Sequence, residues 1–318
     1  WQWQLSGPGR FIHAEGIAAS RSGDVYVADS YGHQIHRFNN RGTIIDAWGS
    51  EGSGEGQFDY SESVAVDDSG NVYVLDFNDR RIQKFSKEGR FISAWGKPGQ
   101  LYNPAGIAVR DDKLYVPDSG DVGDGSGGIH VFSTEGQLLK WIELAPYGYP
   151  SDIAIDAAGN LYVPYSRYLE DEGVMKLDPN GAYLLRWGEL GDGPGEFNGI
   201  RGIAVDVQGL VFVADAGNSR VQVFDENGLF LTRWGRLGTA AGEFRGLTGI
   251  AVDPEGRVYV TDTENGRVQV FTNGFPAPDP SSGLVLDGSF EAPPALMEWT
   301  SGGSLPSQHV SQAIHGSS

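Results

Sequence analysis

Hydrophobic and polar positions alternate along the chain in short runs, and the order of these runs recurs about every 47 residues. Each period contains a Gly-Ile-Ala-Val-Asp-like run, a Val-Tyr-Val-Ala-Asp-like run, an Arg-Val-Gln-Val-Phe-like run and a Phe-Leu-x-x-Trp-like run, separated by turns such as Asp-x-x-Gly. The tryptophans that end the periods are Trp48, Trp95, Trp141, Trp187 and Trp234. Alternation with a period of two is typical of β-strands. Each period therefore predicts four short strands.

One position of the first predicted strand is alanine in all six copies of the repeat. These residues are Ala18, Ala65, Ala108, Ala154, Ala204 and Ala251. A small side chain fits where six strands crowd a common axis, and a four-stranded unit of this length buries both faces only between two neighbours. The pattern predicts an all-β fold, a six-bladed β-propeller of four-stranded antiparallel blades.

The sixth repeat lacks an outer strand directly after its third, because residues 267–271 run into a proline-rich segment that does not continue the sheet. Trp1 lies 47 residues before Trp48, which is the spacing of the repeat. We therefore expect the ring to be closed by an N-terminal strand that pairs with the sixth blade. Trp1 and Trp3 are both candidates for the register residue of that strand, and the sequence leaves the choice open.

A short motif opens the third strand of the fifth and sixth repeats. It reads Asn-Ser-Arg-Val at 218–221 and Asn-Gly-Arg-Val at 265–268, after Asp215 and Asp262. The motif resembles that of the NHL-repeat β-propellers, and the resemblance covers residues 1–274. It implies that the repeated Asp and Arg side chains hold the blades together; they are Asp76, Arg81, Asp215, Arg220, Asp262 and Arg267. The third and fourth repeats have lost the motif, and the first has Gly and Gln in place of its Asn and Arg.

The charge balance narrows the classes of partner. The chain has 318 residues, of which 42 are acidic and 23 basic, for a formal net charge of −19. Nucleic-acid binding needs clustered Lys and Arg, so we expect no nucleic-acid partner but a neutral or cationic one, a protein or a glycan. No apolar run approaches the roughly 18 residues of a spanning helix, so no membrane insertion is expected. The chain has no cysteine, which excludes disulfides, thiolate metal sites and cysteine nucleophiles.

A composition change after residue 274 predicts a domain boundary there. We expect residues 1–274 to form the propeller and residues 275–318 to form a linker and tail rich in Pro, Gly and Ser. The run at 287–291, followed by Trp299, resembles the start of the galactose-binding-like jelly rolls that serve as carbohydrate-binding modules in secreted bacterial proteins. This implies an extracellular or cell-surface bacterial protein, of which the chain is the front portion. The alternatives are a flexible tail and an extended strand that docks on a blade or on a neighbouring molecule.

Ligands of propellers usually bind at the mouth of the central channel, beside the residues that precede the innermost strands. Alignment on the Gly-Ile step assigns these positions to Glu15, Glu62, Ala105, Ser151, Arg201 and Thr248. Two carboxylates, two hydroxyls and one guanidinium suit a small polar ligand or, with water, a calcium ion. The alternative is an ordinary polar rim.

A second candidate site lies in a glycine-rich loop of the third repeat. Asp118, Asp121 and Asp124 follow one another at steps of three, and closely spaced carboxylates are what calcium needs. The EF-hand spacing and its distant bidentate Glu are missing, which favours a solvated insertion. The sequence therefore predicts either no cofactor or calcium.

Three functional hypotheses follow. The first is a non-enzymatic scaffold for interaction or assembly that binds a protein or a glycan. The second is a hydrolase or lyase with calcium or zinc at the channel mouth, in which Glu15 and Glu62 act as ligands or base and Arg201 stabilises an anion. The third is self-assembly into fibres, motivated by the open edge of the sixth blade and by the strand-like run at 284–286.

Overall fold

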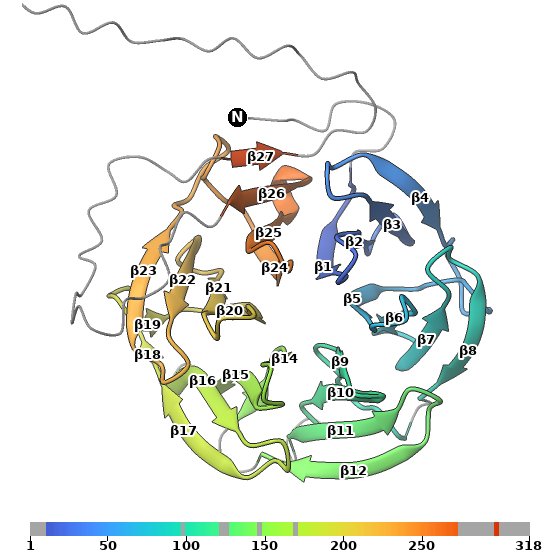
Figure 1. The fold of residues 1–318 in the computed structure, drawn as a ribbon, viewed down its shortest axis with the longest axis horizontal. Coiled ribbons are helices and arrows are strands. Elements are labelled where there is room, and N and C mark those ends of the chain that lie inside the picture. Colours follow the sequence, from blue (N-terminus) through green and yellow to red (C-terminus); the bar gives the residue numbers. More distant parts are fainter. Residues whose placement is uncertain are drawn as a thin grey trace, which may run out of the picture.

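The structure is a computed structural model that describes residues 11–96, 99–120, 127–144, 148–167, 171–272 and 296–298. Figure 1 shows six sheets arranged as blades around a central axis, and the chain passes through them in sequence order. The neighbouring strands within each blade are antiparallel. The prediction of an all-β six-bladed propeller is confirmed. Among the described residues, no helix is both long enough and apolar enough to cross a lipid bilayer.

Blades one, two, five and six have inner strands of six residues. Blade one contains β1 (Ala14–Ala19), β2 (Val25–Asp29), β3 (Gln34–Phe38) and β4 (Ile44–Trp48). Blade two contains β5 (Ser61–Val66), β6 (Val72–Asp76), β7 (Arg81–Phe85) and β8 (Phe91–Trp95). Blade five contains β20 (Ile200–Val205), β21 (Val211–Asp215), β22 (Arg220–Phe224) and β23 (Phe230–Trp234). Blade six contains β24 (Leu247–Val252), β25 (Arg257–Asp262), the 3-10 turn η1 (Thr263–Asn265), β26 (Arg267–Thr272) and β27 (Leu296–Glu298).

Blades three and four have shorter or interrupted inner strands. Blade three contains β9 (Ala108–Arg110), β10 (Lys113–Asp118), β11 (Gly128–Ser133) and β12 (Leu138–Glu143). Blade four contains β13 (Tyr149–Pro150), β14 (Ala154–Ile155), β15 (Leu161–Arg167), β16 (Asp171–Leu177) and β17 (Tyr183–Trp187). Its inner edge is divided, because β13 and β14 pair separately with β15. The parallel pair β18 (Glu189–Leu190) and β19 (Glu196–Phe197) leads into blade five.

The core lies between the blades. The described residues form six clusters of buried hydrophobic side chains, and each cluster draws its members from two neighbouring blades. The cluster between blades one and two, for example, joins Tyr26 and Ile35 to Phe58 and Phe85, all of which are almost fully buried. Because every blade is covered on both faces by its neighbours, the stacking of blades supplies the hydrophobic stabilisation of the ring.

The Asp-x-x-Gly sequences form the predicted hairpin turns. The Asp67 carboxylate accepts the backbone N–H groups of Ser69 and Asn71 at 2.9 and 2.8 Å. Gly70 has φ +84°, a left-handed conformation that favours glycine. In blades two, four, five and six these turns connect the inner strand to the next strand, at the end of the channel opposite the start of the inner strands.

The outer edge of blade six is covered by a strand from the C-terminal tail. Met297 of β27 pairs with Val270 of β26, with flanking pairs on either side. This corrects the expectation that an N-terminal strand would take the position beside β26; residues 1–10 themselves lie outside the described residues. The physical reason is that the free N–H and C=O groups of an edge strand pair with any extended segment in reach. Repeat spacing alone could not distinguish the two ends of the chain as donors of that segment.

Candidate binding site at the channel mouth

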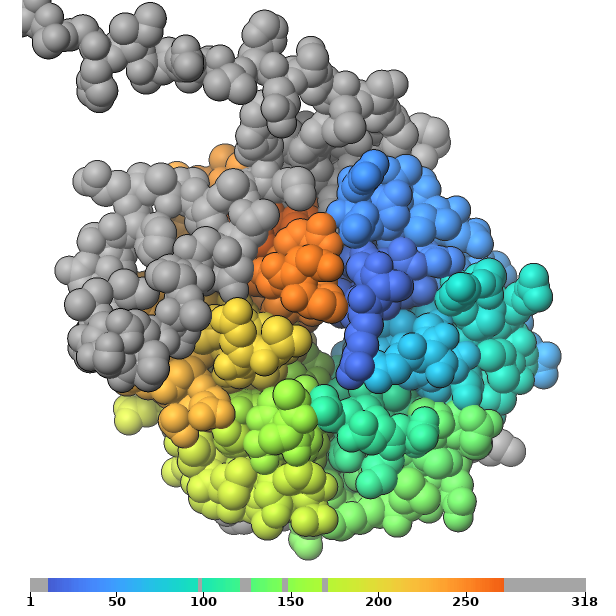
Figure 2. Space-filling model, viewed as in Figure 1, coloured from blue at the N-terminus to red at the C-terminus, as the bar shows by residue number. Residues whose placement is uncertain are grey.

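The inner strands begin at one end of the central channel, and this end holds a cavity of about 500 Å³. Figure 2 shows the channel as an opening between the inner parts of the blades. All the mouth residues predicted from the sequence line this cavity; they are Glu15, Glu62, Ala105, Ser151, Arg201 and Thr248. The repeat register therefore brings them together, as expected from their equivalent places in successive blades. Ligand binding there remains a prediction.

Glycine follows the mouth position in four of the blades because the inner strands approach one another closely. A Cβ atom at Gly16, Gly202 or Gly249 would collide with a backbone carbonyl oxygen of the neighbouring blade. The backbone at the mouth is therefore tightly fixed, and the side chains one residue earlier project from a rigid ring.

Asp152 occupies the position that is glycine in those four blades, and it was missed by our sequence analysis. It lies between β13 and β14, lines the cavity, and accepts the backbone N–H of Ile203 of blade five on Oδ2 at 2.9 Å. Burial raises the pKa of Asp152 to about 7, against the opposing effect of its hydrogen bonds from backbone N–H groups. The interruption of the glycine column was the signal that could have revealed it.

Glu62 is the most isolated carboxyl group of the cavity. Its Oε2 atom is shielded from solvent, and no donor among the described residues forms a hydrogen bond with it. Burial, with a further contribution from the negative charge of Glu15, raises the pKa of Glu62 well above its usual value, while Arg201 acts in the opposite direction. The protonated form of Glu62 is thus favoured more than that of an exposed glutamate.

Glu15 is better supplied with partners. Its Oε2 accepts the hydroxyl of Ser30 at 2.8 Å, and His13 Nδ1 lies 3.9 Å from the same atom. Burial raises the pKa of the Tyr60 phenol, and the neighbouring Glu15 acts in the same direction. Glu15 is therefore held in place by blade one and by the adjoining loop of blade two.

The remaining predicted residues differ in their use. The Thr248 hydroxyl lies 2.8 Å from that of Thr261 and 2.7 Å from that of Thr263, so it serves the internal hydrogen bonding of blade six. Ser151 is half-buried in the wall, whereas Arg201 is exposed at the mouth. Arg201 is thus the residue of this group that is most open to solvent.

Glu172 is a second residue that the sequence analysis did not single out as a site residue. It is 4% exposed, lines the cavity from β16, and accepts the backbone N–H groups of Gly199 and Ile200 at 2.8 and 2.5 Å. Both carboxylate oxygens are used, so Glu172 ties blade four to blade five. No sequence signal could have located it, because it comes from a third strand rather than from the start of an inner one.

Aromatic side chains form a row beside the acidic part of the mouth. The ring centroids of Tyr31 and Tyr60 are 5.6 Å apart, and those of Tyr60 and Phe77 are 6.3 Å apart. His13 extends the row, with its ring 4.4 Å from that of Tyr31. Phe77 lines the cavity, and Tyr31 is 55% exposed. The row therefore leads from the cavity to the surface.

The acidic loop of blade three is described only in part, because Asp121 and Asp124 lie outside the described residues. Asp118 is buried and accepts the backbone N–H groups of Tyr102 and Asn103, each at 2.9 Å. Burial alone would raise the pKa of Asp118, but His130 and these backbone N–H groups together lower it below its usual value. In the described part of the chain, no three His, Asp or Glu side chains form a group that would hold a metal ion. The calcium site stays a prediction.

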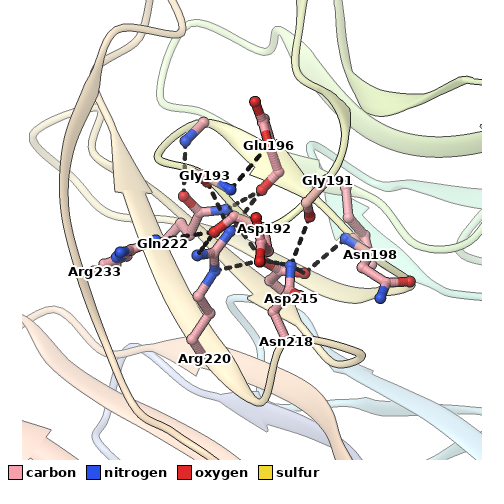
Figure 3. Close-up of polar contacts among 12 residues, drawn as sticks. Gly191, Asp192, Gly193, Glu196, Asn198, Asp215, Asn218, Arg220, Gln222 and Arg233 are labelled. Carbon is pink, nitrogen blue, oxygen red and sulfur yellow. Dashed lines mark hydrogen bonds and ion pairs between the residues drawn. The ribbon is translucent and has the colours of Figure 1, made fainter.

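The repeated Asp and Arg residues form an internal network, which Figure 3 shows for blade five. Arg220 donates from Nε to Asp215 at 2.6 Å and from its terminal nitrogens to the carbonyl oxygens of Asp192, Gly193 and Glu196. The Arg220 and Asp215 side chains are 7% and 0% exposed. These contacts bind the blade to its own entry loop, which is the structural role implied by the family resemblance.

The opposite end of the channel holds a second cavity of about 800 Å³. Its lining includes Asp67, Asp206 and Asp253, whose carboxylates accept the N–H groups of their own turns. Asp68 also lines it and forms an exposed ion pair with Arg21 at 2.7 Å. The carboxylates of this end are largely engaged by the turns themselves.

Comparison with known families identifies the repeats. The NHL repeat model matches residues 11–38, 58–85, 197–224 and 244–271, which are the first three strands of blades one, two, five and six with their entry loops. These four segments are therefore similar to NHL repeats, as the sequence motif indicated.

The chain is similar to curated proteins over a limited length. It is 30% identical over 96 residues to NHL repeat-containing protein 3 of Mus musculus, an alignment that covers 30% of this chain and 28% of that protein. The chain thus spans 28% of the length of that relative.

Solved structures share the fold over a greater length. An inactive variant of virginiamycin B lyase from Staphylococcus aureus, solved with quinupristin, has a TM-score of 0.60 at 14% identity and covers 93% of this chain and 87% of its own. A chain of the nidogen/laminin complex has a TM-score of 0.54 at 17% identity, covering 69% of this chain and 79% of its own. At these identities the similarity shows the propeller fold alone.

Proposed function

We propose that this chain is a non-enzymatic binding module that engages a protein partner with the mouth face of its propeller. The observation that carries the proposal is the combination of a polar cavity with exposed apolar and aromatic residues around it. Ile12, Tyr31 and Tyr102 are 66%, 55% and 43% exposed. Large aromatic side chains are enriched among the residues that dominate binding energy at protein interfaces.

Two comparisons support a binding role. NHL propellers often mediate binding, and one similar fold comes from a complex between proteins, that of nidogen with laminin. We place the module outside a bacterial cell, on the basis of its acidic charge and of the resemblance of its tail to carbohydrate-binding modules. A glycan is the alternative partner. Fibre formation loses its main motivation, since the edge of β26 pairs with β27 of the same chain.

A selection experiment tests the proposal. A random peptide display library is selected on the full chain, and each enriched peptide is measured against the wild type and against the double variant Tyr31→Ala/Tyr102→Ala. We expect enriched peptides to bind the wild type and to lose at least about tenfold in affinity with the double variant, because two anchoring side chains are removed. The control variant Leu229→Ala removes a side chain that is 62% exposed on a blade-five turn. The proposal would be overturned if no peptide is enriched, or if the enriched peptides bind the double variant Tyr31→Ala/Tyr102→Ala as tightly as the wild type.

Acid–base catalysis at the mouth is the second candidate function. It is favoured by Asp152, whose pKa of about 7 suits a group that gives and takes a proton near neutral pH, with Arg201 available to stabilise an anion. The similarity to a lyase supports the same idea at the level of the fold. Since no three potential metal ligands converge among the described residues, we derive no step through a metal ion. If the protein turns over lactones, which are cyclic esters, and this activity is lost in Asp152→Asn, catalysis would replace the binding module as the proposed function.

A further inference from the structure

The carboxylates of the mouth cavity differ in how well their oxygens are satisfied. Both oxygens of Glu172 accept backbone N–H groups, Asp152 accepts one from Ile203, and Glu15 accepts the hydroxyl of Ser30. Glu62 Oε2 is buried and has no donor among the described residues. A buried acceptor without a donor is costly, and a charged donor is the partner that compensates best.

The surroundings of Glu62 are suited to a positive charge. Glu15 on β1 and Asp152 between β13 and β14 both lie close enough to act on Glu62 electrostatically, and Arg201 on β20 is the cation that faces it. Arg201 is the only basic residue among those that line the cavity within the described part of the chain. With Glu172, four carboxyl groups among the described lining residues face one guanidinium, which leaves an excess of negative charge when all are ionised.

The cavity wall also has an apolar component. Ile17, Val64 and Ile107 line it, and Phe77 continues into the aromatic row with Tyr60. Aliphatic walls accommodate the stem of a long basic side chain, and aromatic rings attract its charged head. A hydrated metal ion would make no use of these walls, whereas an organic cation uses both the walls and the carboxylates.

We propose that the mouth cavity binds one organic cation, the ammonium or guanidinium group of a basic side chain, with Glu62 as its principal ion-pair partner. This inference rests on the proposed function and names the chemistry by which the partner is recognised. The volume of about 500 Å³ falls within the roughly 300–1,000 Å³ of known ligand cavities. The bound cation supplies the donor that Glu62 Oε2 lacks.

Binding of a cation at this place is coupled to proton release. Burial raises the pKa of Glu62, and that of Asp152 is about 7, so both groups hold protons more strongly than usual in the free protein. An ammonium or guanidinium favours the ionised form of its neighbours and lowers both pKa values. Affinity therefore increases as the pH rises from about 5.5 to 8, with protons released on binding.

Calorimetric titration of the full chain with capped tripeptides tests the inference. The probes are acetyl-Ala-Lys-Ala-amide, acetyl-Ala-Arg-Ala-amide and, as the uncharged control, acetyl-Ala-Gln-Ala-amide. We expect the two basic peptides to bind and the uncharged peptide to bind at least about tenfold more weakly. Titration in two buffers of different ionisation enthalpy is expected to reveal protons released by the protein.

Matched variants assign the effect to Glu62. Glu62→Gln is expected to weaken the basic peptides at least about tenfold and to reduce the proton release. Asp68→Asn makes the same change of charge in the same blade at the opposite end of the channel, and is expected to leave affinity unchanged. Ala105→Lys supplies a tethered ammonium at the equivalent mouth position of blade three and is expected to block the peptides, which keeps the test valid if Glu62→Gln does not fold.

The outcomes separate this inference from the function on which it rests. Equal binding of the three peptides, or basic-peptide binding unchanged by Glu62→Gln, would overturn the cation site. If library peptides still bind through Tyr31 and Tyr102, the binding module stands without the cation site. If no peptide binds in either experiment, both proposals fail. n-Butylamine and ethylguanidine distinguish the source of the cation: binding as tight as that of the peptides would identify a free small amine, and weaker binding identifies a peptide side chain.

Discussion

Blades five and four stand side by side and are held together in different ways. In blade five the buried Arg220 binds Asp215 and three carbonyl oxygens of its own entry loop. In blade four Tyr165 pairs with Gly173 at the register where blade five pairs Asp215 with Arg220. The carboxylates of Glu172 and Asp152 instead accept backbone N–H groups of blade five.

This difference shows how the sequence of one repeat can depart from the motif: contacts with the neighbouring blade replace the contacts within the blade. In a regular blade such as blade five, the repeated polar residues form hydrogen bonds with the entry loop of the same blade. They are therefore not available to bind a ligand. In the irregular blade four, the carboxylates form hydrogen bonds with the neighbouring blade instead. Its inner strand is interrupted between β13 and β14, where Asp152 lines the channel cavity. The matches to the NHL repeat model follow the same division, since they cover blades one, two, five and six.

Removal of the buried guanidinium of blade five is the strongest test of this comparison. Arg220→Ala leaves Asp215 buried without its ion-pair partner, and we expect a loss of about 3–5 kcal/mol in the free energy of unfolding. Blade four has no arginine at the register of Arg220, so the comparison variant is Arg186→Ala on its outer strand β17. It removes an ion pair to Asp171 whose arginine is 48% exposed, for an expected loss of about 0–1 kcal/mol. Urea denaturation of both variants checks this. Similar losses for the two would contradict the idea that the blades are held differently.

The pH dependence of stability tests the place of Asp152. Its pKa in the folded protein, about 7, lies above the ordinary aspartate value of 3.8, so the stability associated with its protonation is fully present below about pH 4 and is lost as the pH rises through 7. Asp152→Asn keeps an acceptor for the Ile203 N–H but cannot ionise. We expect the variant to melt at a higher temperature than the wild type at pH 8 and at a similar temperature at pH 4. If the difference in melting temperature between the variant and the wild type is the same at pH 4 and pH 8, then ionisation of Asp152 does not lower the stability at high pH.

The smallest effect concerns the histidine of blade three. His130 occupies the register of Gln222 in blade five; its Nε2 lies 3.4 Å from Asp118, and its Nδ1 is buried without a partner among the described residues. Gln222 donates to both Asp215 and the carbonyl oxygen of Glu196. We expect His130→Gln to raise the free energy of unfolding by about 0.5–1.5 kcal/mol, and the reverse change Gln222→His to lower it by a similar amount. Thermal melts of the two variants check this. If His130→Gln lowers the stability, the contacts of His130 in blade three are as favourable as those of Gln222 in blade five.

The mouth residues were predictable to the extent that the repeat register places them. Glu15, Glu62 and Arg201 occupy the second positions of equivalent inner strands, so the alignment of repeats alone brings them to one end of the channel. Asp152 was missed because the alignment used the Gly-Ile step, which blade four lacks. Glu172 could not be predicted, because its place in the cavity depends on how blade four faces blade five.

By itself, the sequence determined the strands, the number of blades and the end of the channel at which each mouth residue lies. These follow from alternation with a period of two and from the recurrence of about 47 residues, which are local patterns repeated in every blade. Only the tertiary structure decided that β27 covers the edge of β26. It also decided that Oε2 of Glu62, unlike the carboxylate oxygens of Glu15, Asp152 and Glu172, is buried without a donor among the described residues. These two features depend on which segments that are distant in the chain come into contact, and on how much solvent those contacts exclude. The spacing of residues along the chain determines neither the contacts nor the excluded solvent.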